Sequence, residues 1–427
     1  MGVASYLLMT GCGMAQPPGG NPSSTTTTSA PTTTTTTSTT TTTAPSTTTT
    51  APSTTTTSST VLPPQPDGTI TRVTNGAVGQ ASGDSEGPAI SADGRYIAFS
   101  SSAPDLVSGD TNGVGDVFVW DRGTSTMTRI TDGDRGSHSP AISADGRYIA
   151  FASSATDLVA GDVNGVYDVF LWDATSGTTT RITDGNGDSW GASISGDGRQ
   201  IAFESAASNL VPGDSNDTND KPDIFVWEAD TGTTTRITDS ANASYFPAIS
   251  ADGGHITFYA FASNEVPDDT NGWWDVFVWE VETGTTTRIT DGNENSLDPT
   301  ISADGRYVTF WSAASNLVSD NTGPGLFLWD ATTGAITRVT NGGKIPRISA
   351  DGRYVVYNRQ GDTSIDVWVW DATTGTSTNI THGTGHSSGG SISEDGNAIA
   401  FASRAFDLVR PDDNGAQDIF LWERTGT

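Results

Sequence analysis

Short runs of alternating apolar and polar residues cover most of this chain, and one run occurs in seven copies. Its first copy, ISADGRYIAF at residues 90–99, predicts a short strand, a turn and a second strand. A repeat of this length without a helical pattern predicts a β-propeller, in which each repeat forms one small sheet. The Asp-Gly pair of the turn returns every 44–55 residues, at Asp93, Asp145, Asp197, Asp252, Asp304, Asp351 and Asp395.

Each repeat predicts four strands. In the second repeat these are residues 140–143, 147–153, 168–173 and 178–183. Asp145-Gly146 predicts a hairpin between the first two strands, because glycine accepts the positive φ of a tight turn. The third strand, DVFLWD, is apolar on both of its faces. Such a strand has to be covered on both sides, as happens when blades pack face to face around a ring.

The third strand carries a tryptophan in every repeat. Burial of so large an apolar side chain stabilises a fold by roughly 1.5–3 kcal/mol or more. We therefore expect these residues to pack between blades rather than to bind a ligand. They are Trp120, Trp172, Trp227, Trp279, Trp329, Trp370 and Trp422.

The two ends of the repeat region predict how the ring closes. Residues 70–74 have the sequence of a fourth strand but precede the first repeat, and the last repeat stops after its third strand at residues 418–423. A ring that closes with such a strand has no exposed end blade. The sequence thus predicts an all-β fold: a seven-bladed propeller of four-stranded blades over residues 67–427, with the N-terminal strand completing the last blade.

The consensus ISxDGRxIAF, followed by DVFVWD and TTTRIT strands, resembles the TolB-type propeller repeat, a relative of WD-repeat blades. This resemblance covers all seven repeats and implies a propeller fold with a surface for interaction. TolB itself joins an α/β domain to a six-bladed ring. The resemblance therefore does not imply TolB's partner or its role in transport.

The N-terminal part of the chain has a different composition. Residues 23–66 are mostly Thr, Ser, Pro and Ala and predict a disordered linker. Residues 1–22 contain a short apolar run that ends in Thr-Gly-Cys12, which resembles a bacterial lipobox. We expect a lipoprotein anchored by lipidation of Cys12, on the cell surface or in the periplasm. The alternatives are an ordinary or uncleaved signal peptide, and a secreted protein.

The charge balance excludes one class of partner. The chain has 20 basic and 50 acidic residues, a net charge of −30. Such a charge repels phosphate backbones, so we expect no nucleic-acid binding. We expect a monomer that contacts a membrane only through its lipid anchor and binds an extracellular protein or glycan.

Five of the loops between the second and third strands share the pattern Asp-x-Asn-x-x-x-Asp. Two carboxylates and an amide oxygen on one tight loop are ligands that Ca²⁺ prefers, so we predict structural calcium sites there. The alternative is that these residues only form turns, copied by duplication of one ancestral repeat. The predicted ligands are Asp110, Asn112 and Asp116; Asp162, Asn164 and Asp168; Asp217, Asn219 and Asp223; Asp269, Asn271 and Asp275; and Asp412, Asn414 and Asp418.

Aromatic residues interrupt the repeat in its third and fourth copies. Trp190 and the pair Tyr245-Phe246 lie just before the first strand, and Trp273-Trp274 lies in a loop that opens to the same end of the ring. Clustered aromatic rings suit stacking on sugars or gripping a peptide. We predict that these five residues form a ligand-binding face over blades three and four. The alternative is that they cap the ring.

Catalytic motifs are weak in this sequence. Two G-x-S-x-G matches, at residues 83–87 and 187–191, fall at the same position of the repeat and read as turn consensus. We therefore predict no catalytic residues and a surface-tethered, non-catalytic binding protein with calcium-stabilised loops. The alternative is an extracellular propeller enzyme acting on polysaccharide, a glycoside hydrolase or lyase.

Overall fold

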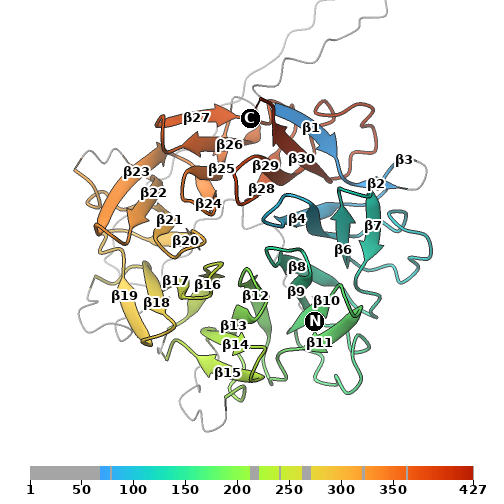
Figure 1. The fold of residues 1–427 in the computed structure, drawn as a ribbon, viewed down its shortest axis with the longest axis horizontal. Coiled ribbons are helices and arrows are strands. Elements are labelled where there is room, and N and C mark those ends of the chain that lie inside the picture. The colour runs from blue at the N-terminus through green and yellow to red at the C-terminus, as the bar shows by residue number, and fades with distance from the viewer. Residues whose placement is uncertain are drawn as a thin grey trace, which may run out of the picture. The chain divides into compact units, whose positions relative to one another are not determined.

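The computed structural model describes residues 68–76, 79–211, 221–239, 242–261, 271–319, 323–361 and 364–426. Within these ranges the chain forms seven four-stranded antiparallel sheets arranged in a ring (Figure 1). The predicted seven-bladed, all-β propeller is confirmed. None of the residues described forms a helix of the length and apolar character needed to cross a membrane. The predicted anchor segment, Cys12 and the predicted linker lie outside the described residues.

Six blades are built from four consecutive strands each. Blade 1 contains β4 (Ser85–Ile90), β5 (Tyr96–Ser101), β6 (Asp116–Asp121) and β7 (Thr126–Arg129). Blade 2 contains β8 (Ser137–Ile142), β9 (Tyr148–Ser153), β10 (Asp168–Asp173) and β11 (Thr178–Arg181). Blade 3 contains β12 (Ser189–Ile194), β13 (Gln200–Ser205), β14 (Asp223–Glu228) and β15 (Thr233–Arg236).

The remaining blades continue this order. Blade 4 contains β16 (Ser244–Ile249), β17 (His255–Ala260), β18 (Asp275–Glu280) and β19 (Thr285–Arg288). Blade 5 contains β20 (Ser296–Ile301), β21 (Tyr307–Ser312), β22 (Gly325–Asp330) and β23 (Ala335–Asn341). Blade 6 contains β24 (Lys344–Ile348), β25 (Tyr354–Gln360), β26 (Ile365–Asp371) and β27 (Thr376–Asn379).

Blade 7 closes the ring. It contains β28 (Ser387–Ile392), β29 (Ala398–Ser403), β30 (Asp418–Arg424) and, as its outer strand, β1 (Gly68–Arg72). The pairing of β1 with β30 is antiparallel, from Gly68 opposite Arg424 to Arg72 opposite Phe420 (Figure 1). A two-residue hairpin, β2 (Asn75–Gly76) with β3 (Gly79–Gln80), follows β1. The predicted closure by an N-terminal strand is confirmed, at residues 68–72.

The hydrophobic core lies between the blades. One cluster joins Val169 and Leu171 of blade 2 to Ile201, Phe203 and Phe225 of blade 3. The third strand therefore buries both faces, as its sequence predicts. The seven tryptophans of this strand pack with one inter-blade cluster each, which confirms their structural role: Trp120, Trp172, Trp227, Trp279, Trp329, Trp370 and Trp422.

The Asp-Gly turn has a structural reason for each residue. Asp145 Oδ1 accepts hydrogen bonds from Ser143 Oγ at 2.7 Å and from the Arg147 backbone N–H at 2.9 Å. Gly146 has φ 73°, and a Cβ there would lie 2.2 Å from the Tyr96 ring of the preceding blade. The glycine thus allows both the positive φ and the close approach of two blades.

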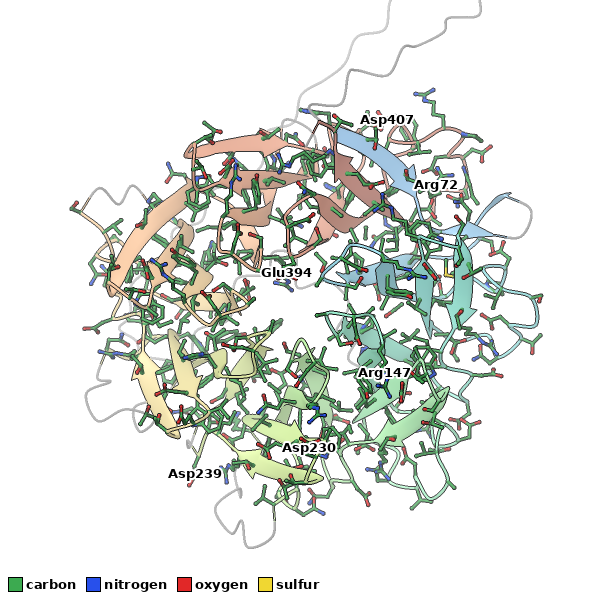
Figure 2. All side chains as sticks on the ribbon, viewed as in Figure 1. Arg72, Arg147, Asp230, Asp239, Glu394 and Asp407 are labelled. Atoms are coloured by element: carbon green, nitrogen blue, oxygen red, sulfur yellow. The ribbon has the colours of Figure 1, made fainter. Side chains whose placement is uncertain are left out.

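The same turns link the blades at one end of the ring, which we call the turn end. Six backbone hydrogen bonds connect neighbouring turns, as in Ala92 N–H to Ala144 O at 3.0 Å. Figure 2 shows Glu394, in the turn of blade 7, close to the centre of the ring and Arg72 at its rim. The first strand of each blade begins at the opposite end, which we call the bulge end. There the blades differ from one another.

Candidate functional site

The seven innermost strands share one irregularity. They are β4, β8, β12, β16, β20, β24 and β28, which lie nearest the centre of the ring (Figure 1). Each shifts its register against the next strand, which marks a β-bulge: the shift follows the second residue in six strands and the first residue, Lys344, in β24. The residue directly after this point has positive φ in all seven blades, and these residues form what we call the bulge ring: Gly87, Ser139, Gly191, Phe246, Asp298, Ile345 and Gly389.

Three consecutive blades place large side chains in this ring. Phe246, Asp298 and Ile345, in blades 4, 5 and 6, have φ of 53°, 54° and 53°. A non-glycine residue in this region costs on the order of 1–3 kcal/mol, and a β-branched residue such as Ile345 is a clear outlier. Glycine avoids this cost in blades 1, 3 and 7. The strain is therefore concentrated where the bulge presents a side chain at the axis.

Five aromatic side chains of blade 4 contact one another at this end, and we call them the aromatic cluster. The Phe246 ring stacks on Tyr259 with centroids 5.8 Å apart, and Tyr245 and Phe261 lie 5.7 and 5.6 Å from Trp274. Phe246 is 54% exposed and Phe261 is 37% exposed, whereas Tyr259 is buried. The cluster thus has a buried base and an exposed upper surface.

A buried carboxyl group joins this cluster to blade 3. Glu204, on β13, is only 3% exposed. Its Oε2 accepts a hydrogen bond from the Phe246 backbone N–H at 2.7 Å, and its carboxylate also bonds the Trp190 side chain. Burial raises the pKa of Glu204 to about 7 against the opposing effect of these two hydrogen bonds. Through its hydrogen bond with the Phe246 N–H, Glu204 stabilises the strained backbone conformation of Phe246.

In blades 5 and 6 the innermost strands carry charged residues. Lys344 and Arg347, both on β24, are exposed. Lys344 Nζ lies 6.0 Å from the centre of the Trp311 ring, and Arg347 donates to the backbone oxygen of Pro346 at 2.8 Å. Burial raises the pKa of Asp298, and the positive charges of Arg347 and Lys344 oppose that rise. We call Trp190, Tyr245, Phe246, Asp298, Lys344 and Arg347 the axial strip.

The acidic loops take part in a different arrangement near the outer strands. In blade 2, Asp168 Oδ1 accepts from Thr183 Oγ1 at 2.7 Å, and Asp168 Oδ2 accepts from Asn164 Nδ2 at 3.0 Å. The Arg181 guanidinium lies 2.8 Å from Asp168 and 3.5 Å from Asp162. Asp168 is fully buried. We call this set the Asp–Arg–Thr network.

The network recurs in four further blades, with one arginine in each. Asp110 and Asp116 pair with Arg129 in blade 1, and Asp412 and Asp418 pair with Arg72 in blade 7. In blades 3 and 4 the described ion pairs are Asp223 with Arg236 and Asp275 with Arg288. Asp217, Asn219 and Asp269 lie outside the described residues.

The repeat and the fold agree with one protein family. Residues 218–409 match the family model of the TolB beta propeller domain. This stretch, somewhat less than half of the chain, carries TolB-type propeller repeats. The resemblance expected from the repeat sequence is thereby confirmed.

Three comparisons place this TolB-type propeller among known proteins. An uncharacterized protein of Agrobacterium fabrum is 32% identical over 96 residues, which cover 22% of this chain and only 29% of that relative. TolB from Acinetobacter baumannii is 19% identical, with 71% of this chain and 64% of that chain covered and a TM-score of 0.44. An oligogalacturonate lyase from Vibrio parahaemolyticus is 12% identical, with coverage of 83% and 93% and a TM-score of 0.56. The likeness to the lyase shows a shared fold alone.

The described contacts of the acidic loops fit an arginine guanidinium better than a calcium ion. Asn164 turns its amide N–H toward Asp168, and its Oδ1 accepts from the Val166 backbone N–H at 3.2 Å. Arg181 already supplies a positive charge to the carboxylates of this loop. Within the described ranges, no group of three or more His, Cys, Asp or Glu side chains is arranged to hold a metal ion. Calcium binding stays a prediction, which chelation can test.

The predicted aromatic residues are only partly brought together. Tyr245, Phe246 and Trp274 lie in the aromatic cluster, and Trp190 reaches it through Glu204. The Trp273 backbone N–H donates to Asn271 Oδ1 at 2.8 Å, but its ring has no aromatic contact among the described residues. Their binding of a ligand stays a prediction.

Sequence reasoning missed several residues of this site: Glu204, Tyr259, Phe261, Trp311, Lys344 and Arg347. Glu204, Tyr259 and Trp311 share one position, the fifth residue of the second strand, opposite the second residue of the innermost strand. Blades 2 and 7 have alanine at this position. A large or charged residue at this position of the repeat was the signal in the sequence that could have indicated these three residues.

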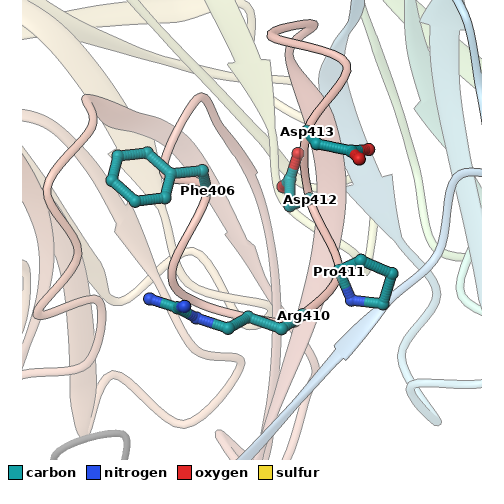
Figure 3. A pocket seen from close by; sticks show the side chains of 5 residues that line it. All are labelled: Phe406, Arg410, Pro411, Asp412 and Asp413. Atoms are coloured by element: carbon teal, nitrogen blue, oxygen red, sulfur yellow. The ribbon is translucent and has the colours of Figure 1, made fainter. Parts of the chain in front are cut away.

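A hollow lies beside the closing strand. Its volume is about 460 Å³, and it is lined by Phe406, Arg410, Pro411, Asp412 and Asp413 of the β29–β30 loop (Figure 3). Arg72 of β1 donates to the backbone oxygens of Val409 and Pro411 at 2.8 and 2.9 Å. The hollow therefore depends on ring closure. Its exposed Phe406 offers a control for the axial strip.

Proposed function

We propose that this chain is a non-catalytic binding protein whose extracellular ligand, a protein or a glycan, docks on the axial strip. The observation that carries the proposal is Phe246, which is 54% exposed, has φ 53° and rests on the aromatic cluster. Strained residues with a supported, exposed aromatic side chain are typical of ligand contacts. The equivalent positions in blades 1 and 7 are glycines without such a side chain.

The proposal includes the expected location. A lipid on Cys12 and a Thr-rich linker would hold the propeller, as a monomer, outside the cytoplasm and away from the membrane surface. Incorporation of labelled palmitate into wild-type protein, and its loss in Cys12→Ser, tests this part. Release of the wild-type protein into the medium without lipid would contradict the anchor and leave the binding site untouched.

Retention on a cell-wall glycan tests the binding site. Full-length protein is incubated with insoluble cell-wall glycan, and the bound fraction is compared between wild type and Phe246→Ala. The matched control is Phe406→Ala, because Phe406 is also 54% exposed but lies in the β29–β30 loop. We expect Phe246→Ala to weaken retention about tenfold or more, since a stacked aromatic side chain contributes at least about 1.5 kcal/mol.

The control also defines failure. Equal retention of Phe246→Ala and wild type, or a loss confined to Phe406→Ala, would contradict the proposed site. If neither wild type nor variant binds glycan, an array of extracellular proteins repeats the comparison with the same two variants. Binding there that again depends on Phe246 would keep the proposed site with a protein ligand.

A second candidate function is an enzyme that acts on polysaccharide. One observation favours it: the buried carboxyl group of Glu204, whose pKa near 7 suits a general acid or base. Release of reducing or unsaturated sugar ends from polysaccharide, abolished by Glu204→Gln, would support this alternative. The absence of turnover in wild type that retains glycan would favour the binding protein.

A further inference from the structure

Two cations at the axis point to a more specific ligand. We infer that the axial strip binds a glycan that carries a carboxylate, and that Lys344 and Arg347 bind that carboxylate. This inference rests on the proposed binding function and names the chemistry of its ligand.

The first step is the state of the two cations. The side chains of Lys344 and Arg347 are both exposed, and they contact the Trp311 ring and the Pro346 backbone oxygen. Burial lowers the pKa of Arg347, and the negative charge of Asp298 opposes that fall. Neither makes an ion pair with any residue in the described part of the chain. By contrast, the arginines of the Asp–Arg–Thr network each contact a carboxylate, as Arg181 contacts Asp168 at 2.8 Å. The strip therefore keeps two donors available to an incoming anion.

The second step is the setting of this positive charge. The chain has a net charge of −30 and only two lysines, Lys221 and Lys344. Arg347 is the single arginine at the next-to-last position of an innermost strand, where the other blades have Ala, Ser or Thr. A guanidinium can bind a carboxylate with two parallel hydrogen bonds. Because the whole molecule repels anions at long range, an isolated carboxylate fits better than a dense polyanion.

The third step is the choice of a glycan over a protein. Four large apolar side chains are exposed among the described residues, and two of them, Phe246 and Phe261, belong to the aromatic cluster. Stable protein interfaces bury about 800 Å² per partner around an apolar centre. Two exposed rings on a polar surface are too small for such a centre. They match the flat apolar face of one or two sugar rings.

These steps give one arrangement of the ligand. Sugar rings stack over the aromatic cluster of blade 4, and an acidic substituent reaches across blade 5 to β24. Asp298 lies in the bulge ring between the two. Its negative charge interacts with Arg347 and Lys344 and would repel a carboxylate, so we assign the ligand's carboxylate to the two cations and not to Asp298.

Chemical reduction of the glycan tests the binding of a carboxylate separately from the binding of the sugar rings. Full-length protein is tested on cell-wall glycan and on the same glycan after its carboxylates are reduced to alcohols with carbodiimide and borohydride. We expect about tenfold weaker retention of wild type on the reduced glycan, the usual size of one charge-assisted hydrogen-bond pair. Arg347→Gln should weaken retention on native glycan similarly and have no effect on reduced glycan.

Two further variants complete the design. Arg347→Lys keeps the charge without the planar fork and should recover part of the affinity. Arg199→Gln makes the same charge change at an exposed pair with Asp230, which lies at the turn end, and should retain native glycan like wild type. Lys344→Gln should weaken retention less than Arg347→Gln, because it removes a point charge only.

The outcomes are distinguishable. Equal retention on native and reduced glycan, with Phe246→Ala still impaired, overturns the carboxylate inference and leaves the proposed function standing. No retention of wild type on either glycan overturns the inference of a glycan ligand, and the array of extracellular proteins then decides whether the proposed function stands. Displacement of bound protein by a glutamate-rich peptide, but not by a hexuronate-containing oligosaccharide at equal concentration, overturns the choice of a glycan.

Discussion

The Asp–Arg–Thr network lies in five of the seven blades and the bulge ring in all seven, yet the side chains of the network are nearly uniform and those of the bulge ring are not. In the network, a threonine hydroxyl donates to the first residue of the third strand at 2.6–2.8 Å in five blades. In the bulge ring, the backbone conformation repeats while the side chain ranges from glycine to phenylalanine. Buried polar groups tolerate little change because an unpartnered one is costly. The axial positions carry no such constraint, so function can differ there.

Two blades show what the network requires. In blade 5, Gly325 replaces the aspartate, and Arg338 donates instead to the Gly323 backbone oxygen at 2.9 Å. In blade 6, Asn379 replaces the arginine and donates to Asp366 at 3.0 Å. One member of the pair can change if the other still finds a hydrogen bond. The network therefore supplies hydrogen-bond partners to buried polar groups, whereas the bulge ring presents side chains at the axis.

The largest expected effect comes from breaking the network at the closing blade with Arg72→Met. Arg72 contacts Asp412 at 3.0 Å and Asp418 at 3.4 Å, and its side chain is 5% exposed. The variant leaves buried Asp418 without a cation, which costs about 3–5 kcal/mol of unfolding free energy. Urea denaturation measures the loss. Arg199→Met, at an ion pair whose side chains are 61% and 68% exposed, should lose less than about 1 kcal/mol. Equal losses would refute the role of Arg72 in stabilising the closing blade.

A second variant, Glu204→Gln, probes the support of the bulge ring. Burial raises the pKa of Glu204 from 4.5 to about 7, so folding favours the neutral form. The resulting stability is fully present below pH 4.5 and decreases as the pH rises through 7, by an amount on the order of 3 kcal/mol. Glu204→Gln removes this dependence and should be more stable than wild type at pH 8. Parallel pH profiles of the two proteins would contradict this.

A smaller difference separates two arginines of the network. Arg181→Met strands the buried Asp168 carboxylate and should cost about 3 kcal/mol. Arg338→Met strands no carboxylate at the first position of the third strand, because Gly325 stands there in blade 5, and should cost roughly 1 kcal/mol. Thermal melts of both variants in one buffer give the comparison. A larger loss for Arg338→Met would mean that packing on Phe327, not charge, sets the value.

The smallest expected effect concerns calcium. If arginine supplies the positive charge of the acidic loops, excess EDTA leaves the melting temperature unchanged, and added Ca²⁺ does not raise it. A fall in EDTA that Ca²⁺ reverses would establish the calcium sites predicted from Asp-x-Asn-x-x-x-Asp. The same melt on Arg181→Met shows whether removal of the guanidinium opens the loop to an ion.

The fold was predictable because the repeat is strict. The third strand of blade 2 has the predicted limits, Asp168–Asp173. The first strand was placed at residues 140–143, but β8 runs over Ser137–Ile142. Ser139 has φ 55°, and the bulge lets the strand continue through a position that Ser-Pro makes look like a strand start.

The site was less predictable because it combines residues from neighbouring strands and blades. Tyr245 and Phe246 interrupt a consensus, so they were visible in the sequence. Glu204 occupies a strand position that looks like core, and its partner Phe246 lies in the next blade. The contact of Arg181 with Asp168 was not visible in the sequence, because it depends on the pairing of the third and fourth strands.

Hydrogen–deuterium exchange with a soluble cell-wall glycan fragment tests the central claim, that one side of the bulge end binds a ligand. The account predicts slower exchange at the starts of β12, β16, β20 and β24 and unchanged exchange in β28, β4 and β8. Protection spread evenly around the ring, or confined to the β29–β30 loop that contains Phe406, would contradict it.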